Sequence, residues 1–224
     1  MPTLPKYLNE PKPAKKPIVF DLFDTLINES SVYKEFFSYM DKKYHTEMSA
    51  EEFVKKLFKN QNEFVFADSK KAYKEITRLA YSKLIKQADP KDVELLFDLY
   101  SKMDFFPGII QLLLKLEKNY DLFILTNTDN DLLEKVNLPT KCQVKFKKIF
   151  TAENNGVYKP NPGSYEKIVD YTKLPRNNII YVSSNKWDIK KSKEFGFNVK
   201  SIEELKNGRW ETIHKIPSIM AKPR

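Results

Sequence analysis

Four short polar motifs in the 224-residue sequence carry side chains that could meet at one catalytic site. They are Asp21-Leu22-Phe23-Asp24-Thr25, Thr126-Asn127, Val157-Tyr158-Lys159-Pro160-Asn161-Pro162 and Ser183-Ser184-Asn185-Lys186-Trp187-Asp188. A carboxylate that ends a buried strand and precedes a threonine, as Asp21 would, suits an aspartyl nucleophile with hydrogen-bond donors beside it. Taken singly, each motif is equally well explained as a turn, an exposed lysine or a helix cap.

The apolar pattern around these motifs predicts strands and helices in alternation. Strands are expected at residues 18–22, 120–126, 148–150, 179–183 and 198–201, and helices at 109–119, 129–135, 162–172 and 189–195. Such alternation is typical of an α/β fold with a doubly wound parallel sheet. The four motifs then fall at the C-terminal ends of strands, the edge at which open α/β sheets bind ligands. Their shared placement favours one common site.

The stretch after the first strand is predicted to be entirely helical, with helices at residues 31–44, 50–67, 68–87 and 90–103. Ser49, with Glu52 three residues later, has the spacing of a capping box. We therefore predict a Rossmann-like core of residues 17–29 and 105–207 with an inserted helical cap at 30–104. Extended tails are expected at 1–16 and 208–224. The linkers at 28–30 and 104–108 would act as hinges.

The formal net charge is +9, but only four of the 39 basic residues are arginines. Nucleic-acid readers rely on arginine forks, so a lysine-rich solvated surface is the preferred interpretation. A small anionic organic substrate fits this charge, and a homodimer or an acidic protein or ribonucleoprotein partner stays open. The single cysteine, Cys142, excludes an internal disulfide. Without a membrane-spanning run or a signal-peptide core, we expect a cytoplasmic protein, or one in an organelle matrix.

Together the motifs resemble the haloacid dehalogenase superfamily from residue 18 to about residue 202. The fourth motif, followed by Phe195-Gly196-Phe197, resembles the Ser-Ser-Asn-x-Trp-Asp and Phe-Gly-Phe signatures of its L-2-haloacid dehalogenase branch. Tyr165, in a Lys-Pro-x-Pro-x-x-Tyr pattern, is similar to the same branch.

The resemblance implies a role for each residue. Asp21 would attack the substrate carbon and displace halide, and water would hydrolyse the resulting ester. The supporting catalytic residues would be Thr25, Thr126, Asn127, Lys159, Ser183, Asn185 and Asp188. Lys159 would keep Asp21 ionised. Substrate-binding positions would be Phe23, Lys59, Tyr165 and Trp187.

Two departures from the family patterns leave three functions open. Phe23 and Ser184 stand where the superfamily's phosphatases place acids, which predicts no metal ligands and no cofactor. Lys59 stands where the dehalogenase branch uses a cap arginine, and lysine is no equivalent of a guanidinium fork. A metal-independent 2-haloacid dehalogenase is the first hypothesis. A Mg²⁺-dependent phosphatase and a catalytically inactive binding subunit are the alternatives.

Overall fold

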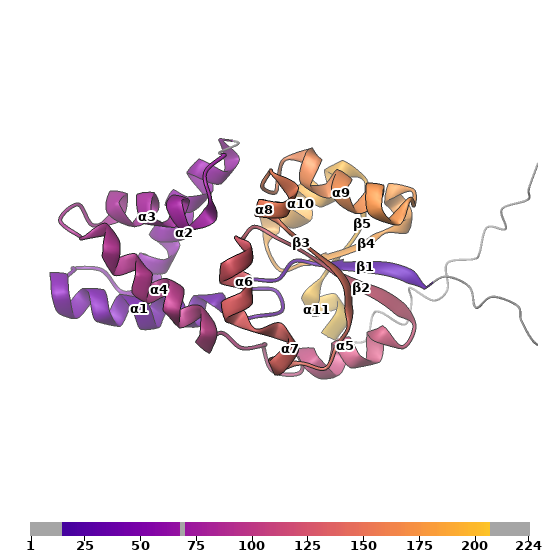
Figure 1. The fold of residues 1–224 in the computed structure, drawn as a ribbon, viewed down its shortest axis with the longest axis horizontal. Helices are drawn as coiled ribbons and strands as arrows, with labels where there is room; N and C mark the ends of the chain where they lie inside the picture. Colours follow the sequence, from indigo (N-terminus) through magenta and orange to yellow (C-terminus); the bar gives the residue numbers. More distant parts are fainter. Residues whose placement is uncertain (1–14, 68–69, 207–224) are drawn as a thin grey trace, which may run out of the picture.

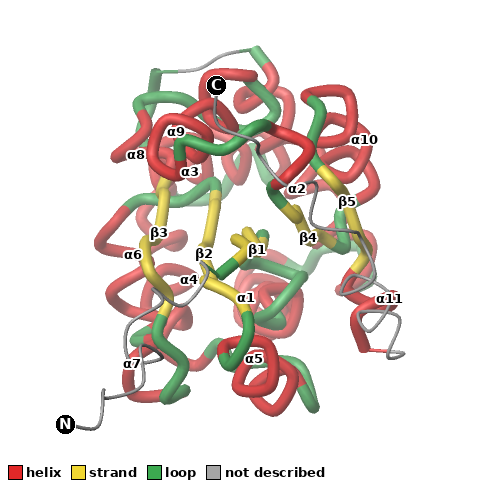
Figure 2. Tube along the Cα trace, turned by 90° about the vertical axis from the view of Figure 1, so that its right-hand side faces the viewer, coloured by secondary structure: helices red, strands yellow, loops and turns green. Residues whose placement is uncertain are grey.

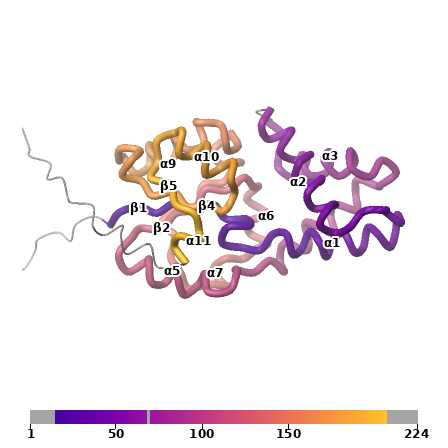
Figure 3. Tube along the Cα trace, turned by 180° about the vertical axis from the view of Figure 1, so that it is seen from behind, coloured from indigo at the N-terminus to yellow at the C-terminus, as the bar shows by residue number. Residues whose placement is uncertain are grey.

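The computed structural model describes residues 15–67 and 70–206. They form a parallel sheet flanked by helices, with a separate group of helices beside it (Figure 1). We call residues 29–102 the helical block and the remaining described chain the core. Seen from behind in Figure 3, β1 (Lys16–Phe20) runs towards the helical block.

The sheet has five parallel strands in the order β3-β2-β1-β4-β5, with β1 at its centre (Figure 2). The other strands are β2 (Tyr120–Thr126), β3 (Phe146–Thr151), β4 (Ile180–Ser183) and β5 (Asn198–Ser201). Along β1, Ile18 and Phe20 join one apolar cluster and Val19 the other, all fully buried. Asp21, the next residue, therefore emerges at the middle of the C-terminal edge. The predicted α/β class is confirmed.

Helices cover both faces of this sheet. One apolar cluster contains side chains of α5 (Ile109–Glu117), α6 (Asn130–Val136), α7 (Leu138–Lys141), α8 (Ala152–Asn155) and α11 (Ile202–Lys206). The other contains side chains of α9 (Pro162–Thr172), and α10 (Lys186–Phe195) packs against it. A short 3₁₀ turn, η3 (Arg176–Asn178), precedes β4.

The helical block consists of α1 (Glu29–Tyr44), α2 (Ala50–Phe66), α3 (Tyr73–Leu84) and α4 (Val93–Leu99), with 3₁₀ turns η1 (Pro90–Asp92) and η2 (Tyr100–Lys102) on either side of α4. Aromatic rings fill its centre, where Phe36 lies 6.0 Å from Phe53 and 5.5 Å from Tyr81 between centroids. The Ser49 hydroxyl accepts from the Glu52 backbone N–H at 3.2 Å, which confirms the predicted cap of α2.

Several elements differ from the sequence prediction. The helix expected at 68–87 begins only at Tyr73 and ends at Leu84, and residues 68–69 lie outside the described residues. The short helices α7, α8 and α11 carry too few apolar repeats to be recognised. Lys16, assigned to the tail, is the first residue of β1, where it pairs with Tyr120. Of the predicted tails, residues 1–14 and 208–224 fall outside the described residues. Among the described helices, none is both long and apolar enough to cross a membrane.

The two linkers to the helical block pair with each other. The Asn28 N–H donates to the Asp104 carbonyl at 3.0 Å, and the Phe106 N–H donates to the Leu26 carbonyl at 2.9 Å. An antiparallel bridge joins Ile27 to Phe105 between them. The block therefore leaves and re-enters the core through one double-stranded connection.

A core carboxylate also caps a helix of the block. Asp129, buried just after β2, accepts from the backbone N–H groups of Tyr73 at 2.8 Å and Lys74 at 2.9 Å, at the start of α3. The Tyr158 hydroxyl of the core donates to the Lys71 carbonyl of the block at 2.7 Å. These contacts hold the block against the C-terminal edge of the sheet.

Replacing Asp129 with alanine should loosen this attachment. Asp129→Ala leaves two N–H groups without their acceptor and should lower the free energy of unfolding by about 1–2 kcal/mol. Urea denaturation measures the loss, and hydrogen exchange of α3 should accelerate. Asp131→Ala is the control, because the ion pair of Asp131 with Lys74 is exposed and should contribute less than about 0.5 kcal/mol. Equal effects of the two substitutions would contradict the capping role.

Candidate active site

A cavity of about 120 Å³ lies between the C-terminal edge of the sheet and the helical block. The core lines it with Asp21, Phe23, Asp24, Thr126, Asn127, Lys159, Asn185 and Trp187. The block lines it with Glu29, Phe58, Gln61, Asn62, Val65 and Tyr73. The predicted position of the helical insertion, over the sheet edge that carries Asp21, is confirmed.

The two carboxylate oxygens of Asp21 have different surroundings. Oδ2 accepts from the Thr25 hydroxyl at 2.9 Å, the Asn185 amide at 2.8 Å and the Ser183 hydroxyl at 3.3 Å. Oδ1 accepts from the Lys159 ammonium at 2.8 Å. A tight turn returns Thr25 to Asp21, with Asp24 at a left-handed φ of 53°. With three donors on Oδ2 and one on Oδ1, the oxygen that keeps free lone pairs is Oδ1.

Lys159 lies between two carboxylates. Besides Asp21 it reaches Asp188 Oδ2 at 3.0 Å, and its side chain is only 2% exposed. Burial alone would lower the pKa of Lys159, but Asp188 and Asp21 outweigh it and hold that pKa above its usual value. Lys159 therefore stays an ammonium, and the predicted reach to both carboxylates is confirmed.

The backbone of Lys159 is fixed by a side chain at the end of β2. Asn127 Oδ1 accepts from the Lys159 N–H at 2.7 Å, and Asn127 Nδ2 donates to the Lys159 carbonyl at 2.9 Å. This pair of bonds sets where the ammonium can reach. Asn127 thus positions Lys159 as well as lining the cavity.

Asp188 lies behind Lys159, fully buried and with both oxygens bonded. Tyr165 donates to Oδ1 at 2.8 Å, and Tyr181 donates to Oδ2 at 2.8 Å. Burial raises the pKa of Asp188, and the Lys159 ammonium works against that rise. The two tyrosine rings pack edge to face, 5.9 Å apart. Asp188 acts on the site through Lys159.

The cavity also contains a buried acid from the helical block. Glu29 is 6% exposed and accepts from the Tyr100 hydroxyl at 3.1 Å. Burial and the negative charges of Asp24 and Asp21 hold the pKa of Glu29 well above its usual value, although the Tyr100 hydrogen bond lowers it. Glu29 is therefore harder to ionise in the folded protein than in water.

The structure brings most of the residues predicted from the sequence together. Those in contact with Asp21 or lining its cavity are Thr25, Thr126, Asn127, Lys159, Ser183, Asn185, Phe23 and Trp187. Asp188 is one contact away, through Lys159. Tyr165, predicted to bind substrate, instead supports Asp188 and does not line the cavity.

Lys59, also predicted to bind substrate, is placed elsewhere. It is exposed and lines a different hollow, with Lys55 and Glu63, on the outer side of α2. Two residues further on, Gln61 is 2% exposed and lines the Asp21 cavity. The structure therefore does not bring Lys59 into the Asp21 cavity, because a shift of two residues turns a helical side chain by about 200°.

Sequence reasoning missed Glu29, Gln61, Tyr73 and Tyr181. One signal was present for Gln61, which continues the apolar stripe of Phe53 and Leu57 at a spacing of four. A polar residue within an apolar stripe indicates a buried polar contact. Glu29 looked like an ordinary acid in a first helical turn, and nothing in the sequence shows its burial.

The donor set does not suit a divalent ion. In the described part of the chain there is no group of three or more His, Cys, Asp or Glu side chains that could hold a metal. Phe23 contributes no oxygen and packs on Tyr100, with ring centroids 5.8 Å apart. The Ser184 hydroxyl is bonded to the Asp24 carbonyl. Lys159 instead supplies the positive charge between the two acids.

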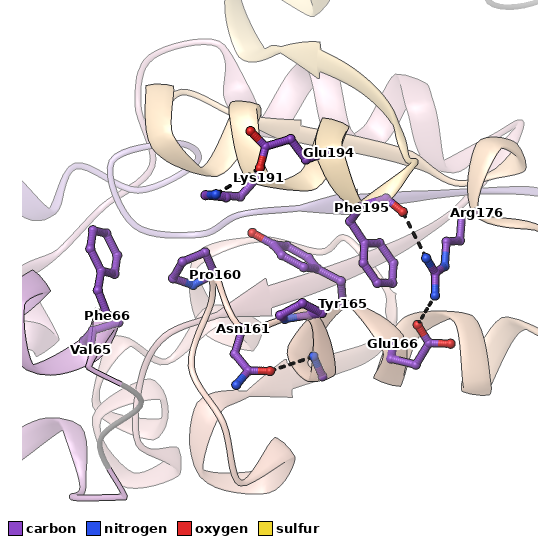
Figure 4. Close-up of a pocket in the computed structure, with 12 residues that line it drawn as sticks. Val65, Phe66, Pro160, Asn161, Tyr165, Glu166, Arg176, Lys191, Glu194 and Phe195 are labelled. Atoms are coloured by element: carbon purple, nitrogen blue, oxygen red, sulfur yellow. Dashed lines mark hydrogen bonds and ion pairs between the residues drawn. The ribbon is translucent and has the colours of Figure 1, made fainter.

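A larger hollow of about 650 Å³ lies along the seam between α2 and the core (Figure 4). Phe66 borders it on one side, and the ion pair of Arg176 with Glu166, at 2.8 Å, on the other. None of its lining residues is among the side chains hydrogen-bonded to the Asp21 carboxylate. Asp21 and Lys159 line the smaller cavity, which shares Val65 with this hollow.

A family model described as haloacid dehalogenase-like hydrolase matches residues 18–202. The chain belongs to this family. It is 28% identical over 113 residues to (S)-2-haloacid dehalogenase 4A of Burkholderia cepacia, an alignment covering 50% of this chain and 49% of that protein. Haloacetate dehalogenase H-2 of Moraxella sp. (strain B) is 29% identical over 101 residues, 45% of each chain. The alignments thus span about half the length of these relatives.

Solved structures share the fold of the family. L-2-haloacid dehalogenase from Xanthobacter autotrophicus, with chloropropionic acid covalently bound, superposes with a TM-score of 0.67. The match covers 83% of this chain and 76% of that one at 21% identity. At this identity the likeness shows the fold alone.

Removing the Lys159 ammonium should destabilise the protein strongly. Lys159→Met leaves Asp21 and Asp188 buried without a counter-charge and should cost about 3–5 kcal/mol of unfolding free energy, measured in urea. Adding Asp188→Asn to this variant should recover part of the loss. The control, Lys190→Met, breaks an exposed pair with Glu194 and should change stability by less than about 0.5 kcal/mol. A small loss for Lys159→Met would mean that the ammonium is not needed to offset the two acids.

Glu29 should make stability depend on pH. Its pKa is raised on folding, so its stabilisation is complete below about pH 4.3 and declines as pH rises towards the folded-state pKa. Because Glu29→Gln cannot ionise, the variant should gain stability relative to the unaltered chain between pH 5 and 7, by up to about 1.4 kcal/mol per pH unit. Urea denaturation at each pH tests this. Parallel stability curves would show that Glu29 ionises normally in the folded protein.

Proposed function

We propose that this protein is a metal-independent hydrolase that displaces halide from small 2-halo acids through a covalent ester on Asp21. The observation that carries the proposal is the unequal environment of the Asp21 carboxylate, with three donors on Oδ2 and Lys159 alone on Oδ1. Three hydrogen bonds fix the orientation of the group while Oδ1 keeps lone pairs for attack.

The first step forms a bond between Asp21 Oδ1 and the halogen-bearing carbon, as the carbon–halogen bond breaks and halide leaves with the electron pair. In the second step water adds to the carboxyl carbon of Asp21. The bond between that carbon and the bridging oxygen, the former Oδ1, then breaks, so that this oxygen leaves with the product. The product is the 2-hydroxy compound, and Asp21 returns as an acid that releases its proton. One halide and one proton are released for each water consumed.

The charges of the site suit this sequence. Asp21, Asp188 and Lys159 together carry one net negative charge, and halide departure removes it. Because the site is buried, Lys159 stabilises the ionised Asp21 before the reaction. Once Asp21 has become an ester, the charge of Lys159 is balanced by Asp188. The proposal is also supported by family membership and by the printed activities of the partial relatives, haloacid and haloacetate dehalogenation.

The test is isotope incorporation at Asp21. Turnover of a 2-halo compound in H₂¹⁸O should place ¹⁸O in the peptide that contains Asp21, since water attacks the carboxyl carbon. Asp21→Asn should abolish halide release with little change in melting temperature, because an amide has the same shape and is a poor nucleophile. Asp98→Asn, at an exposed pair with Lys135, is the control that should retain activity.

A chelator separates this mechanism from that of a phosphatase. EDTA should leave halide release unchanged, because the cavity offers an ammonium where a divalent ion would need oxygens. Halide release that persists in Asp21→Asn, or chelator-sensitive release of phosphate from esters, would overturn the proposal.

A further inference from the structure

A few side chains separate the small cavity from the large hollow beside it. Val65 lines both spaces and is only 4% exposed. Its neighbour Phe66 lines the hollow and packs edge to face on Trp187, which lines the cavity, with ring centroids 5.3 Å apart. Figure 4 shows Val65 and Phe66 on the side of the hollow that the block forms. On the core side, Pro160 lines the hollow and directly follows Lys159, which lines the cavity. The two spaces therefore share a wall, which consists on the block side of Val65 and Phe66.

This wall lies on an apolar side of the cavity. Phe58 and Val65 both line the cavity and are seven residues apart on α2, so their side chains point the same way. Trp187 approaches from the core and packs on the residue next to Val65. The Lys159 ammonium and the Asn185 amide, which bind the carboxylate proposed as nucleophile, also come from the core. An alkyl group on the reacting carbon would therefore lie towards Val65, against apolar side chains.

The two spaces differ in volume. The cavity, of about 120 Å³, has the volume of about four water molecules in the liquid, which suits a halo acid of two or three carbons. The hollow has about 650 Å³, and Phe66, Pro160, Pro162 and Phe195 contribute apolar side chains to it. Each methylene buried there would add about fourfold in affinity. The wall thus keeps a longer alkyl chain from apolar space that is already present.

We propose that Val65 and Phe66 limit the substrate to 2-halo acids of two or three carbons, and that the hollow accepts a longer alkyl chain once this wall is shortened. The inference rests on the proposed function and adds no chemical step to it. Asp21 still displaces halide from carbon 2, and water still cleaves the ester. Because Phe66 is 49% exposed, shortening it should leave the fold intact.

The test measures halide release from chloroacetate, 2-chloropropionate and 2-chlorohexanoate. Incorporation of ¹⁸O at Asp21 in H₂¹⁸O establishes that each acid reacts through the covalent ester, and Asp21→Asn supplies the blank. For the unaltered chain, kcat/KM should fall by about tenfold or more from 2-chloropropionate to 2-chlorohexanoate, because a pocket that cannot hold an extra methylene discriminates by at least about this factor.

Two variants then assign the limit to the wall. Phe66→Ala removes the ring that packs on Trp187 and should raise kcat/KM for 2-chlorohexanoate about tenfold, with less than about threefold change for 2-chloropropionate. Each of the three added methylenes can contribute up to about fourfold once it is buried. Val65→Ala should act in the same direction. Tyr39→Ala is the matched control, because Tyr39 is an exposed aromatic residue of α1 that lines neither space. Melting curves establish that each variant is folded.

Each outcome decides the question. A preference for the short acids that is lost in Phe66→Ala or Val65→Ala supports the inference. If the unaltered chain turns over 2-chlorohexanoate as fast as 2-chloropropionate, with ¹⁸O at Asp21, the inference is overturned and the proposed function stands. A preference for short acids that neither variant changes has the same consequence. No halide and no ¹⁸O from any of the three acids overturns the proposed function and this inference with it. The second variant keeps the test decisive if the first fails to fold.

Discussion

The site depends on one buried ammonium placed between two acids. Lys159 contacts Asp21 at 2.8 Å and Asp188 at 3.0 Å, in surroundings where none of the three charges could remain alone. Its backbone is held by Asn127, and its far carboxylate by two tyrosines. The packing of Tyr165 and Tyr181 therefore keeps Asp188, and through it the Lys159 ammonium, in place. The ammonium in turn holds one oxygen of Asp21.

The helical block strengthens the interactions among these three charges. By covering the C-terminal edge of the sheet it excludes water from Asp21, which is 5% exposed, and low polarity strengthens every electrostatic interaction in the cavity. The same exclusion makes any uncompensated charge or unpaired polar atom costly. The block thus strengthens the electrostatic interactions of Asp21 and also restricts what can lie beside it.

The core half of the site could be predicted from the sequence because strand and motif are contiguous. A buried parallel strand ends where its polar residues begin, and parallel strands all end at one edge, so Asp21, Asn127, Ser183 and Asp188 had to meet. The block half could not be predicted in this way. The rotation of α2 about its axis, which exposes Lys59 and buries Gln61, is set by packing against α1 and α3. Tyr181 lies within an apolar strand, so the sequence gives no sign that its hydroxyl donates to Asp188.

The residues around Asp21 and the cavity residues of the helical block differ in how tightly they are constrained. The groups that act on Asp21 come from strand ends and are constrained together, since moving one would leave a charge or a polar atom unpaired. Gln61 and Glu29 come from helices that reach the core through one paired linker and the Asp129 cap. The Lys159 ammonium bonds to Asp21, Tyr181 and Asp188 and to neither of these two side chains. A fold of this kind can keep the residues around Asp21 in place while its inserted helices change the cavity wall that faces them.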